Sequence, residues 1–237
     1  MSTPDRVTDS GHHRLDPRQG NSVRTVAIDG PAGAGKSTLA VNLAKHLGLE
    51  RLDTGAMYRA VAWAALDRGV DVSDRQAVAA LARVLEIDVD HGVTVDGADA
   101  TRAIRTSSVD AAVSAVAANP EVRTELVRRQ REWVERHGGG VVEGRDIGTV
   151  VLPGADLKVY LTASANERAK RRAEERNDRR SVEQVEADLK RRDRLDSTRT
   201  DSPLPAPGQA ADVVVVDSTH KSAASILEEV LRCLHAG

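Results

Sequence analysis

The stretch that decides the fold is VRTVAIDGPAGAGKSTLAVNLAKHLG, Val23 to Gly48. Its first seven residues, VRTVAID, contain a short apolar run and predict a buried strand. Leucines at one-turn spacing then predict an amphipathic helix over residues 36–46. A glycine-rich turn joins the two, and a strand, a tight turn and a helix in this order are typical of a phosphate-binding unit.

The turn fits the pattern G-x-x-x-x-G-K-[ST] in full. Glycines let successive backbone N–H groups point inward at an anion, and the helix that follows adds the positive end of its dipole. We expect the phosphates of ATP to lie on Gly30, Pro31, Ala32, Gly33, Ala34, Gly35, Lys36, Ser37 and Thr38. In such loops the lysine reaches the β- and γ-phosphates and the serine hydroxyl is a ligand for Mg²⁺. The loop therefore predicts ATP and Mg²⁺ as cofactors, with Lys36 as a catalytic residue and Ser37 at the metal.

The composition is that of a soluble globular protein of 237 residues, with 40% hydrophobic and 30% charged residues. A net charge of -2 and only four aromatic residues argue against nucleic acid as a partner. No apolar run approaches the ~20 residues that span a bilayer, so no membrane partner is expected. The single cysteine, Cys233, fits a reducing compartment, and we expect a cytoplasmic monomer. Residues 1–22 are polar and predict a disordered tail.

The rest of the chain alternates helices with short apolar strands. Helices are expected over residues 55–67, 75–85, 108–117, 120–137 and 222–234, and strands over 141–142, 157–162 and 212–217. The capping box SDRQ, at residues 73–76, starts the helix over 75–85, and the capping boxes SANE and SVEQ, at residues 164–167 and 181–184, start two further helices. Between residues 85 and 106 alternating residues and two turns predict a small meander. This pattern predicts an α/β fold with a parallel sheet of about five strands, covered by helices on both faces.

Two segments stand apart from the sheet. Residues 55–118 form an insertion that suits a nucleoside monophosphate (NMP) acceptor, and residues 165–200 read as two charged helices joined by the polar turn RNDRRS. We interpret the second segment as a lid that closes arginines over the transferred phosphate and excludes water. Its basic residues alternate with acidic ones, which disfavours a nucleic-acid surface. Residues 23–237 are thus expected to be one P-loop kinase domain.

Other P-loop classes lack their signatures here. There is no N-K-x-D for guanine and no LSGGQ-like transporter motif, while Glu143 and Asp217 both remain candidates for the acidic residue that ends a Walker B strand. A small-molecule kinase needs a second, arginine-rich pocket, and LDTGAMYR (residues 52–59) supplies a helix start followed by Arg59. No catalytic histidine is expected, because a phosphate oxygen is already a nucleophile.

Five motifs, IDGPAGAGKST, LDTGAMYR, SAVAANPEVR, VVEGRDIGTVV and KRRDRLDSTR, resemble those of bacterial cytidylate kinases in order and spacing. The resemblance covers residues 26–216. It implies transfer of the γ-phosphoryl group of ATP to CMP or dCMP, a reaction of pyrimidine metabolism. It implies no partner beyond these small molecules.

The resemblance also implies roles for individual residues. Thr54 and Arg59 would belong to the acceptor-phosphate pocket, and Ser114 and Arg123 would lie near the cytosine. The remaining substrate residues would be Arg145 and Asp146, near the acceptor, and Arg192, Asp196 and Arg199 in the lid. Arg145 and Arg192 would be catalytic together with the loop lysine. The interpretation of residues 165–200 as a lid separately predicts that Arg168, Arg172 and Arg192 contact ATP.

Two other functions remain open from the residues themselves. One is a P-loop kinase for a non-nucleotide metabolite such as a sugar acid. The other is a nucleotide-binding regulator whose lid moves without net phosphoryl transfer.

Overall fold

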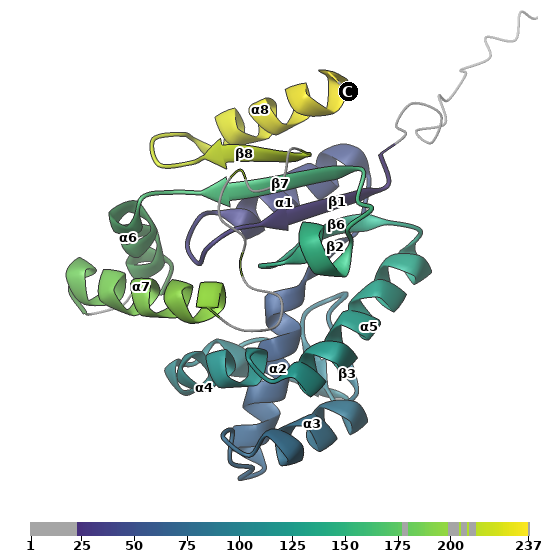
Figure 1. The fold of residues 1–237 in the computed structure, drawn as a ribbon, viewed down its shortest axis with the longest axis vertical. Coiled ribbons are helices and arrows are strands. Elements are labelled where there is room, and N and C mark those ends of the chain that lie inside the picture. Colours follow the sequence, from purple (N-terminus) through teal and green to yellow (C-terminus); the bar gives the residue numbers. More distant parts are fainter. Residues whose placement is uncertain (1–22, 177–179, 199–203, 205–207, 209–211, 237) are drawn as a thin grey trace, which may run out of the picture.

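The computed structural model describes residues 23–176, 180–198, 204, 208 and 212–236 (Figure 1). The predicted tail over residues 1–22 and the predicted lid residue Arg199 lie outside these ranges.

The predicted five-stranded parallel sheet is confirmed. Its strands lie in the order β2 (Arg51–Asp53), β6 (Gly140–Glu143), β1 (Thr25–Asp29), β7 (Leu157–Thr162) and β8 (Val213–Asp217), and each neighbouring pair is parallel. Strand β1 lies at the centre, with β6 and β2 on one side and β7 and β8 on the other; the chain runs from β1 to β2 on the first side and later crosses from β6 to β7 on the second. Ligands of open α/β sheets bind outside the carboxyl ends of the strands at such a switch point.

Alternation along β1 divides the core into two layers. Val26 and Ile28 pack with helices α1 (Lys36–Leu47) and α8 (Ala223–Ala236) on one face of the sheet. Ala27, between them in the sequence, belongs to the layer on the opposite face. Successive side chains of a strand point to opposite faces, so a continuous apolar run is needed where both faces are covered.

Strand β8 differs from the prediction of a buried strand. Only Val216 of its five residues is buried, and Val215 is 40% exposed. The strand pairs with β7 alone and forms one edge of the sheet, where its apolar sequence does not require complete burial.

The predicted insertion, residues 55–118, lies in a helical unit beyond the carboxyl ends of the strands. This unit contains α2 (Thr54–Asp67), α3 (Arg75–Val84), a short 3₁₀ turn, η1 (Ala103–Arg105), and α4 (Ser107–Ala117), and it also includes α5 (Pro120–His137), which follows the predicted bounds. The predicted meander is a small antiparallel sheet of β3 (Ile87–Asp88), β4 (Thr94–Val95) and β5 (Ala98–Asp99). Asp96 and Gly97 both take positive φ angles in the turn between β4 and β5, as the two-residue turns of hairpins require.

Helix starts follow the sequence with one correction. Asn119 caps α5 by accepting a 3.2 Å hydrogen bond from the backbone N–H of Glu121, as expected. Ser73, expected to cap α3, instead donates to Asp71. The cap is Asp74, whose carboxylate accepts from the N–H of Ala77 at 3.0 Å. Aspartate is as good an N-cap as serine, and here it stands one residue closer to the helix.

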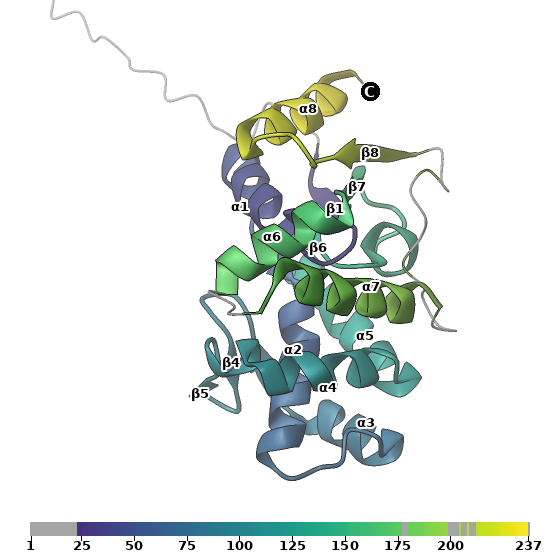
Figure 2. The same ribbon diagram turned by 90° about the vertical axis from the view of Figure 1, so that its left-hand side faces the viewer.

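The predicted lid is a hairpin of α6 (Ala165–Arg176) and α7 (Val182–Thr198), which we call the α6–α7 hairpin. Both predicted capping boxes start these helices, and at Ser181 the box is reciprocal with Gln184. Figure 2 shows the hairpin between the sheet and α4. Ala32 of the phosphate loop packs into the hairpin's small apolar core, so the hairpin is seated directly on the loop.

Candidate active site

The phosphate loop connects β1 to α1 at the centre of the sheet's carboxyl edge. Gly30 takes a φ of +142°, and a Cβ there would lie 2.0 Å from the carbonyl oxygen of Leu161. A Cβ on Gly33 would come within 2.9 Å of the Arg168 carbonyl oxygen. The loop therefore needs these glycines both for conformation and for close packing.

Helix α1 begins without a side-chain cap, since its N-cap is Gly35. An anion at this position would satisfy the exposed N–H groups of the first turn. Lys36 folds back over the loop and donates from Nζ to the carbonyl oxygen of Pro31 at 2.9 Å. Burial first, and then the nearby charge of Arg145, lowers the pKa of Lys36 to about 7. The geometry and the electrostatics fit an anionic ligand, whose charge would favour the protonated lysine.

Glu143, at the end of β6, is the carboxylate that faces the loop. The Ser37 hydroxyl donates to its Oε2 at 2.7 Å, and Arg51 contacts its Oε1 at 3.0 Å. Burial, followed by the charge of Asp53, raises the pKa of Glu143. Asp217, the other Walker B candidate, lies at the end of the edge strand and accepts from Thr219. Of the two candidates, the structure places Glu143 beside the phosphate loop.

Asp29 is a site residue that sequence reasoning missed. It ends β1, directly before the phosphate loop, and is 5% exposed. Its carboxylate accepts from the N–H groups of Ile147 and Gly148 at 2.7 and 2.8 Å. These residues begin η2 (Ile147–Val151), a turn of π-helix that follows Arg145 and Asp146. Residues 143–146, with the sequence EGRD, precede this turn, and we call them the EGRD loop. Asp29 thus connects the EGRD loop to the start of the phosphate loop.

The acceptor side of the site contains a buried ion pair between Arg123 of α5 and Asp146. The Arg123 guanidinium lies 5.8 Å from the centre of the Tyr58 ring. Arg145 donates from Nε to Asp196 of α7 at 2.9 Å, so the hairpin contacts the EGRD loop. Thr54, at the start of α2, donates to the Glu143 carbonyl oxygen at 2.7 Å. These contacts place residues from α2, α5, β6 and α7 around one space.

That space is a cavity of about 410 Å³ beside the phosphate loop. The predicted residues in its wall are Ala32, Gly33, Gly35, Lys36, Ser37, Thr38, Thr54, Arg59, Arg123, Arg145, Asp146, Arg172, Arg192 and Asp196. Gly30, Pro31 and Ala34 are outside the wall and form the body of the loop. Ser114 lines a neighbouring crevice of about 900 Å³ between α4 and the α6–α7 hairpin, which shares Arg172 and Arg192 with the first cavity.

Arg168, expected to contact ATP, does not line the cavity. It is buried under the phosphate loop, where its guanidinium donates to the carbonyl oxygens of Ala163 and Ala32, both at 3.1 Å, and to Asp193 of α7 at 2.6 Å. These bonds anchor the hairpin to the loop. The periodicity of α6 does not distinguish such an anchor from an arginine that faces the ligand.

Several wall residues were not predicted as site residues: Asp53, Gly55, Tyr58, Arg105, Val113, Ala117, Gly144, Arg171 and Glu175. Arg171 is held by two bonds to Ser218, whose hydroxyl in turn donates to the carbonyl oxygen of Ala34 at 2.9 Å. Arg171 lies in an arginine-rich helix, and its sequence position did not distinguish it from the other arginines of the same helix.

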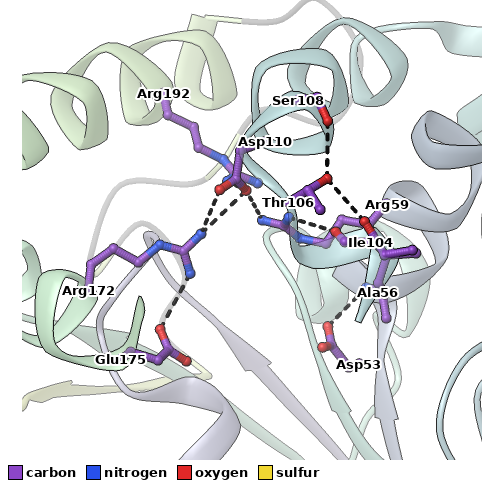
Figure 3. Close-up of polar contacts among 11 residues, drawn as sticks. Asp53, Ala56, Arg59, Ile104, Thr106, Ser108, Asp110, Arg172, Glu175 and Arg192 are labelled. Carbon is purple, nitrogen blue, oxygen red and sulfur yellow. Dashed lines mark hydrogen bonds and ion pairs between the residues drawn. The ribbon is translucent and has the colours of Figure 1, made fainter. Parts of the chain in front are cut away.

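Three arginines of the cavity wall converge on one carboxylate outside it, that of Asp110 (Figure 3). Asp110 of α4 faces Arg59 of α2, Arg172 of α6 and Arg192 of α7. Burial, and then the charges of Arg145 and Arg59, lowers the pKa of Arg192 to about 9. Its Nε is buried without a hydrogen-bond partner in the described part of the chain. A buried donor of this kind fits a phosphate ligand.

Within the described ranges, no helix combines the length and the apolar character needed to cross a membrane. The same residues contain no group of three or more His, Cys, Asp or Glu side chains placed to hold a metal ion.

Comparison with known proteins gives a consistent match over most of the chain. A family model described as cytidylate kinase matches residues 26–236. The cytidylate kinase of Mycolicibacterium paratuberculosis (strain ATCC BAA-968 / K-10) is 48% identical over 217 residues, which cover 86% of this chain and 92% of that protein.

A second relative is longer than this chain. The bifunctional pantoate ligase/cytidylate kinase of Synechococcus sp. (strain JA-3-3Ab) is 46% identical over 219 residues, covering 87% of this chain and 40% of that protein. The chain therefore spans about two fifths of the length of this bifunctional relative. Among solved structures, a gluconokinase from Sinorhizobium meliloti 1021 has a TM-score of 0.51 at 15% identity, over 91% of this chain and 94% of its own. That likeness supports the P-loop kinase fold alone.

Proposed function

The chain belongs to the cytidylate kinase family, and we propose that it transfers the γ-phosphoryl group of ATP to CMP or dCMP, giving ADP and CDP or dCDP. One observation carries the proposal: a single cavity brings the phosphate loop together with guanidinium groups from α2, α5, α6 and α7. Two nucleotides held phosphate to phosphate need this arrangement, because arginine binds phosphate oxygens in pairs.

The donor half of the cavity is the phosphate loop. The backbone N–H groups at the start of α1 and the ammonium of Lys36 would hold the triphosphate of ATP. The Ser37 hydroxyl and the Glu143 carboxylate would hold Mg²⁺, directly or through water, and oxygen donors of this type suit that ion. When bound, Mg²⁺ would neutralise charge on the phosphate oxygens.

The acceptor half lies between α2, α5 and the EGRD loop. Thr54 and Arg59 would bind the CMP phosphate, and Arg123 with Asp146 would face the cytosine. Ser114 would reach the base from the adjoining crevice. Asp196 and Arg199 would contact the sugar hydroxyls and the nucleotide. The aromatic ring of Tyr58, beside Arg123, adds a flat surface to this half.

In the reaction an oxygen of the CMP phosphate attacks the γ-phosphorus of ATP, and the bond from that phosphorus to the β,γ-bridging oxygen breaks. The protein contributes mainly positioning and charge stabilisation. Lys36, Arg145 and Arg192 would stabilise negative charge on the transferred group. The α6–α7 hairpin would act as a lid, with Arg172 as a further contact to ATP, and its closure would keep water from the phosphoryl group.

The identity of the phosphoryl acceptor distinguishes a cytidylate kinase from other P-loop kinases. ADP release is measured with CMP, dCMP, UMP, AMP and dTMP under identical conditions. We expect the cytidine nucleotides to give the highest kcat/KM. Faster turnover with UMP or dTMP would overturn the assignment. A kinase for a sugar acid would phosphorylate no nucleoside monophosphate, and a regulator would bind ATP without forming ADP.

We also propose that the enzyme works in the cytoplasm as a monomer in pyrimidine nucleotide metabolism, with small molecules as its partners. Its single cysteine suits a reducing compartment. Analytical ultracentrifugation of the full chain, with and without nucleotides, tests the monomer.

A further inference from the structure

Asp110 lies at the centre of a cluster of three arginines. The family resemblance gave no role to this aspartate. Its Oδ1 lies 2.6 Å from Nη2 of Arg59. Nη2 of Arg172 lies 3.4 Å from each of its carboxylate oxygens, and Nη1 of Arg192 lies 3.9 Å from Oδ1. Figure 3 shows the three guanidinium groups converging on this one side chain.

The three arginines come from different parts of the fold. Arg59 belongs to α2 in the helical unit, while Arg172 and Arg192 belong to the two helices of the α6–α7 hairpin. Asp110 itself lies on α4, in the helical unit. Its carboxylate therefore connects the part of the protein proposed to hold CMP with the part proposed to close over ATP.

The cluster needs an anion in its present arrangement. The side chains of Asp110 and its three partners are between 12 and 23% exposed, so solvent screens their charges only partly. Arg145 and Arg59 both act on Arg192 as like charges. A carboxylate among these cations offsets the repulsion that would otherwise separate the hairpin from α2.

The arginines keep donors for a substrate while Asp110 holds them. Nε of Arg192 is buried and has no hydrogen-bond partner among the residues the structure describes. Arg59, Arg172 and Arg192 all line the cavity beside the phosphate loop, whereas Asp110 lies in the wall of the adjoining crevice. Asp110 thus contacts these arginines without lining the cavity beside the phosphate loop.

We propose that Asp110 is a positioning residue for phosphoryl transfer, which docks the α6–α7 hairpin on the helical unit and aims the guanidinium groups of Arg59, Arg172 and Arg192 into the cavity. This inference rests on the proposed function for its catalytic consequence, but docking of the hairpin is independent of it.

The kinetic test compares Asp110→Asn, Asp110→Glu and the control Glu186→Gln. The control removes a carboxylate whose ion-pair partner, Lys190, is on the same hairpin helix at 2.6 Å. We expect Asp110→Asn to lower kcat with CMP about 10- to 100-fold, the scale of a misplaced catalytic group. Asp110→Glu should recover part of this loss, and the control should match the wild type. Thermal unfolding of each variant verifies that the fold is retained.

The docking test measures a distance and needs no turnover. Spin labels are placed on Ala115→Cys of α4 and Ala187→Cys of α7, two exposed positions, in a Cys233→Ser background. Without nucleotides, the wild-type pair should give a narrow distance distribution, and Asp110→Asn should broaden it or shift it to longer distances. Glu186→Gln should leave it unchanged.

The two tests separate the inference from the proposed function. If wild type does not phosphorylate CMP, the proposed function fails, and the distance measurement still decides whether Asp110 docks the hairpin. An unchanged distribution in Asp110→Asn overturns the docking role. A kcat of Asp110→Asn equal to that of the control, or tighter CMP binding with faster turnover, overturns the positioning role.

Discussion

The carboxylate of Asp29 accepts a 2.8 Å hydrogen bond from the backbone N–H of Gly148, although the two residues are 119 positions apart in the chain. A second bond, from Ile147, completes the contact. Asp29 directly precedes the phosphate loop, and Gly148 follows the EGRD loop. The hydrogen bond therefore fixes the ATP half and the acceptor half of the site relative to each other.

The burial of Asp29 makes the stability of the protein depend on pH. Burial raises the pKa of Asp29 to about 6, although two backbone hydrogen bonds oppose the shift. A carboxyl whose pKa is higher in the folded than in the unfolded chain holds its proton longer when folded. Its contribution to stability is therefore lost as the pH rises from about 4 to 6, by about 3 kcal/mol at most.

Asp29→Asn should remove that part of the pH dependence. Urea unfolding at pH 4, 5, 6 and 7 should show the free energy of unfolding of the wild type falling relative to the variant across this range. Parallel curves would contradict the assignment. The variant should also lower kcat, because an amide offers one oxygen to the two N–H groups of Ile147 and Gly148.

Lys36→Ala should abolish transfer while leaving CMP affinity almost intact, because the lysine lies in the donor half of the cavity. Calorimetric titration with CMP checks the affinity, and ADP release checks the transfer. An equal loss of CMP binding would rule out the two-pocket arrangement.

Arg168 and Arg172, one turn apart on α6, should respond differently to alanine. Arg168→Ala breaks a buried ion pair with Asp193 and should destabilise the protein by roughly 3 kcal/mol. Arg172→Ala should destabilise the protein less, because its contacts to Asp110 and Glu175 are long, at 3.4 Å, and it should instead slow phosphoryl transfer. Denaturant unfolding and kcat, measured on both variants, test this contrast. If Arg168→Ala instead slowed transfer and Arg172→Ala destabilised the protein, Arg168 would be the ligand contact and Arg172 the anchor, contrary to this account.

Arg123→Lys should raise KM for CMP about tenfold or more, with KM for ATP little changed. Lysine keeps a positive charge beside Asp146 but loses the planar fork of the guanidinium. Arg128→Lys on the same helix is the matched control, because Arg128 is 52% exposed and pairs with Glu125 and Glu132. Equal effects of the two substitutions on KM for CMP would exclude a role for Arg123 in the acceptor pocket.

The sequence predicted most of the fold because its signals are local. The phosphate loop, the Asn119–Pro120 helix start and the turn at Asp96–Gly97 each depend on a few neighbouring residues. The edge position of β8 was not predictable from its apolar run, since strand order is a long-range property. The Ser73 cap failed because the adjacent Asp74 is an equally good cap.

Site residues divide in the same way. Most of those in recognisable motifs, such as Lys36 and Arg145, line the cavity. Arg168 and Asp110 lie in helices whose sequence pattern does not show which way each side chain points. Only the packing shows that Arg168 anchors the α6–α7 hairpin and that Asp110 contacts three arginines. Asp29 reads as the end of a strand, and its partners lie more than 100 residues away.

The decisive measurement follows the phosphoryl group itself. The wild-type protein is incubated with ATP labelled at the γ-phosphate, Mg²⁺ and CMP, and the labelled products are separated by chromatography. We predict that the label appears in CDP, and in dCDP when dCMP is the acceptor. Label that stays in ATP, or that passes only to inorganic phosphate, would refute phosphoryl transfer to a cytidine nucleotide.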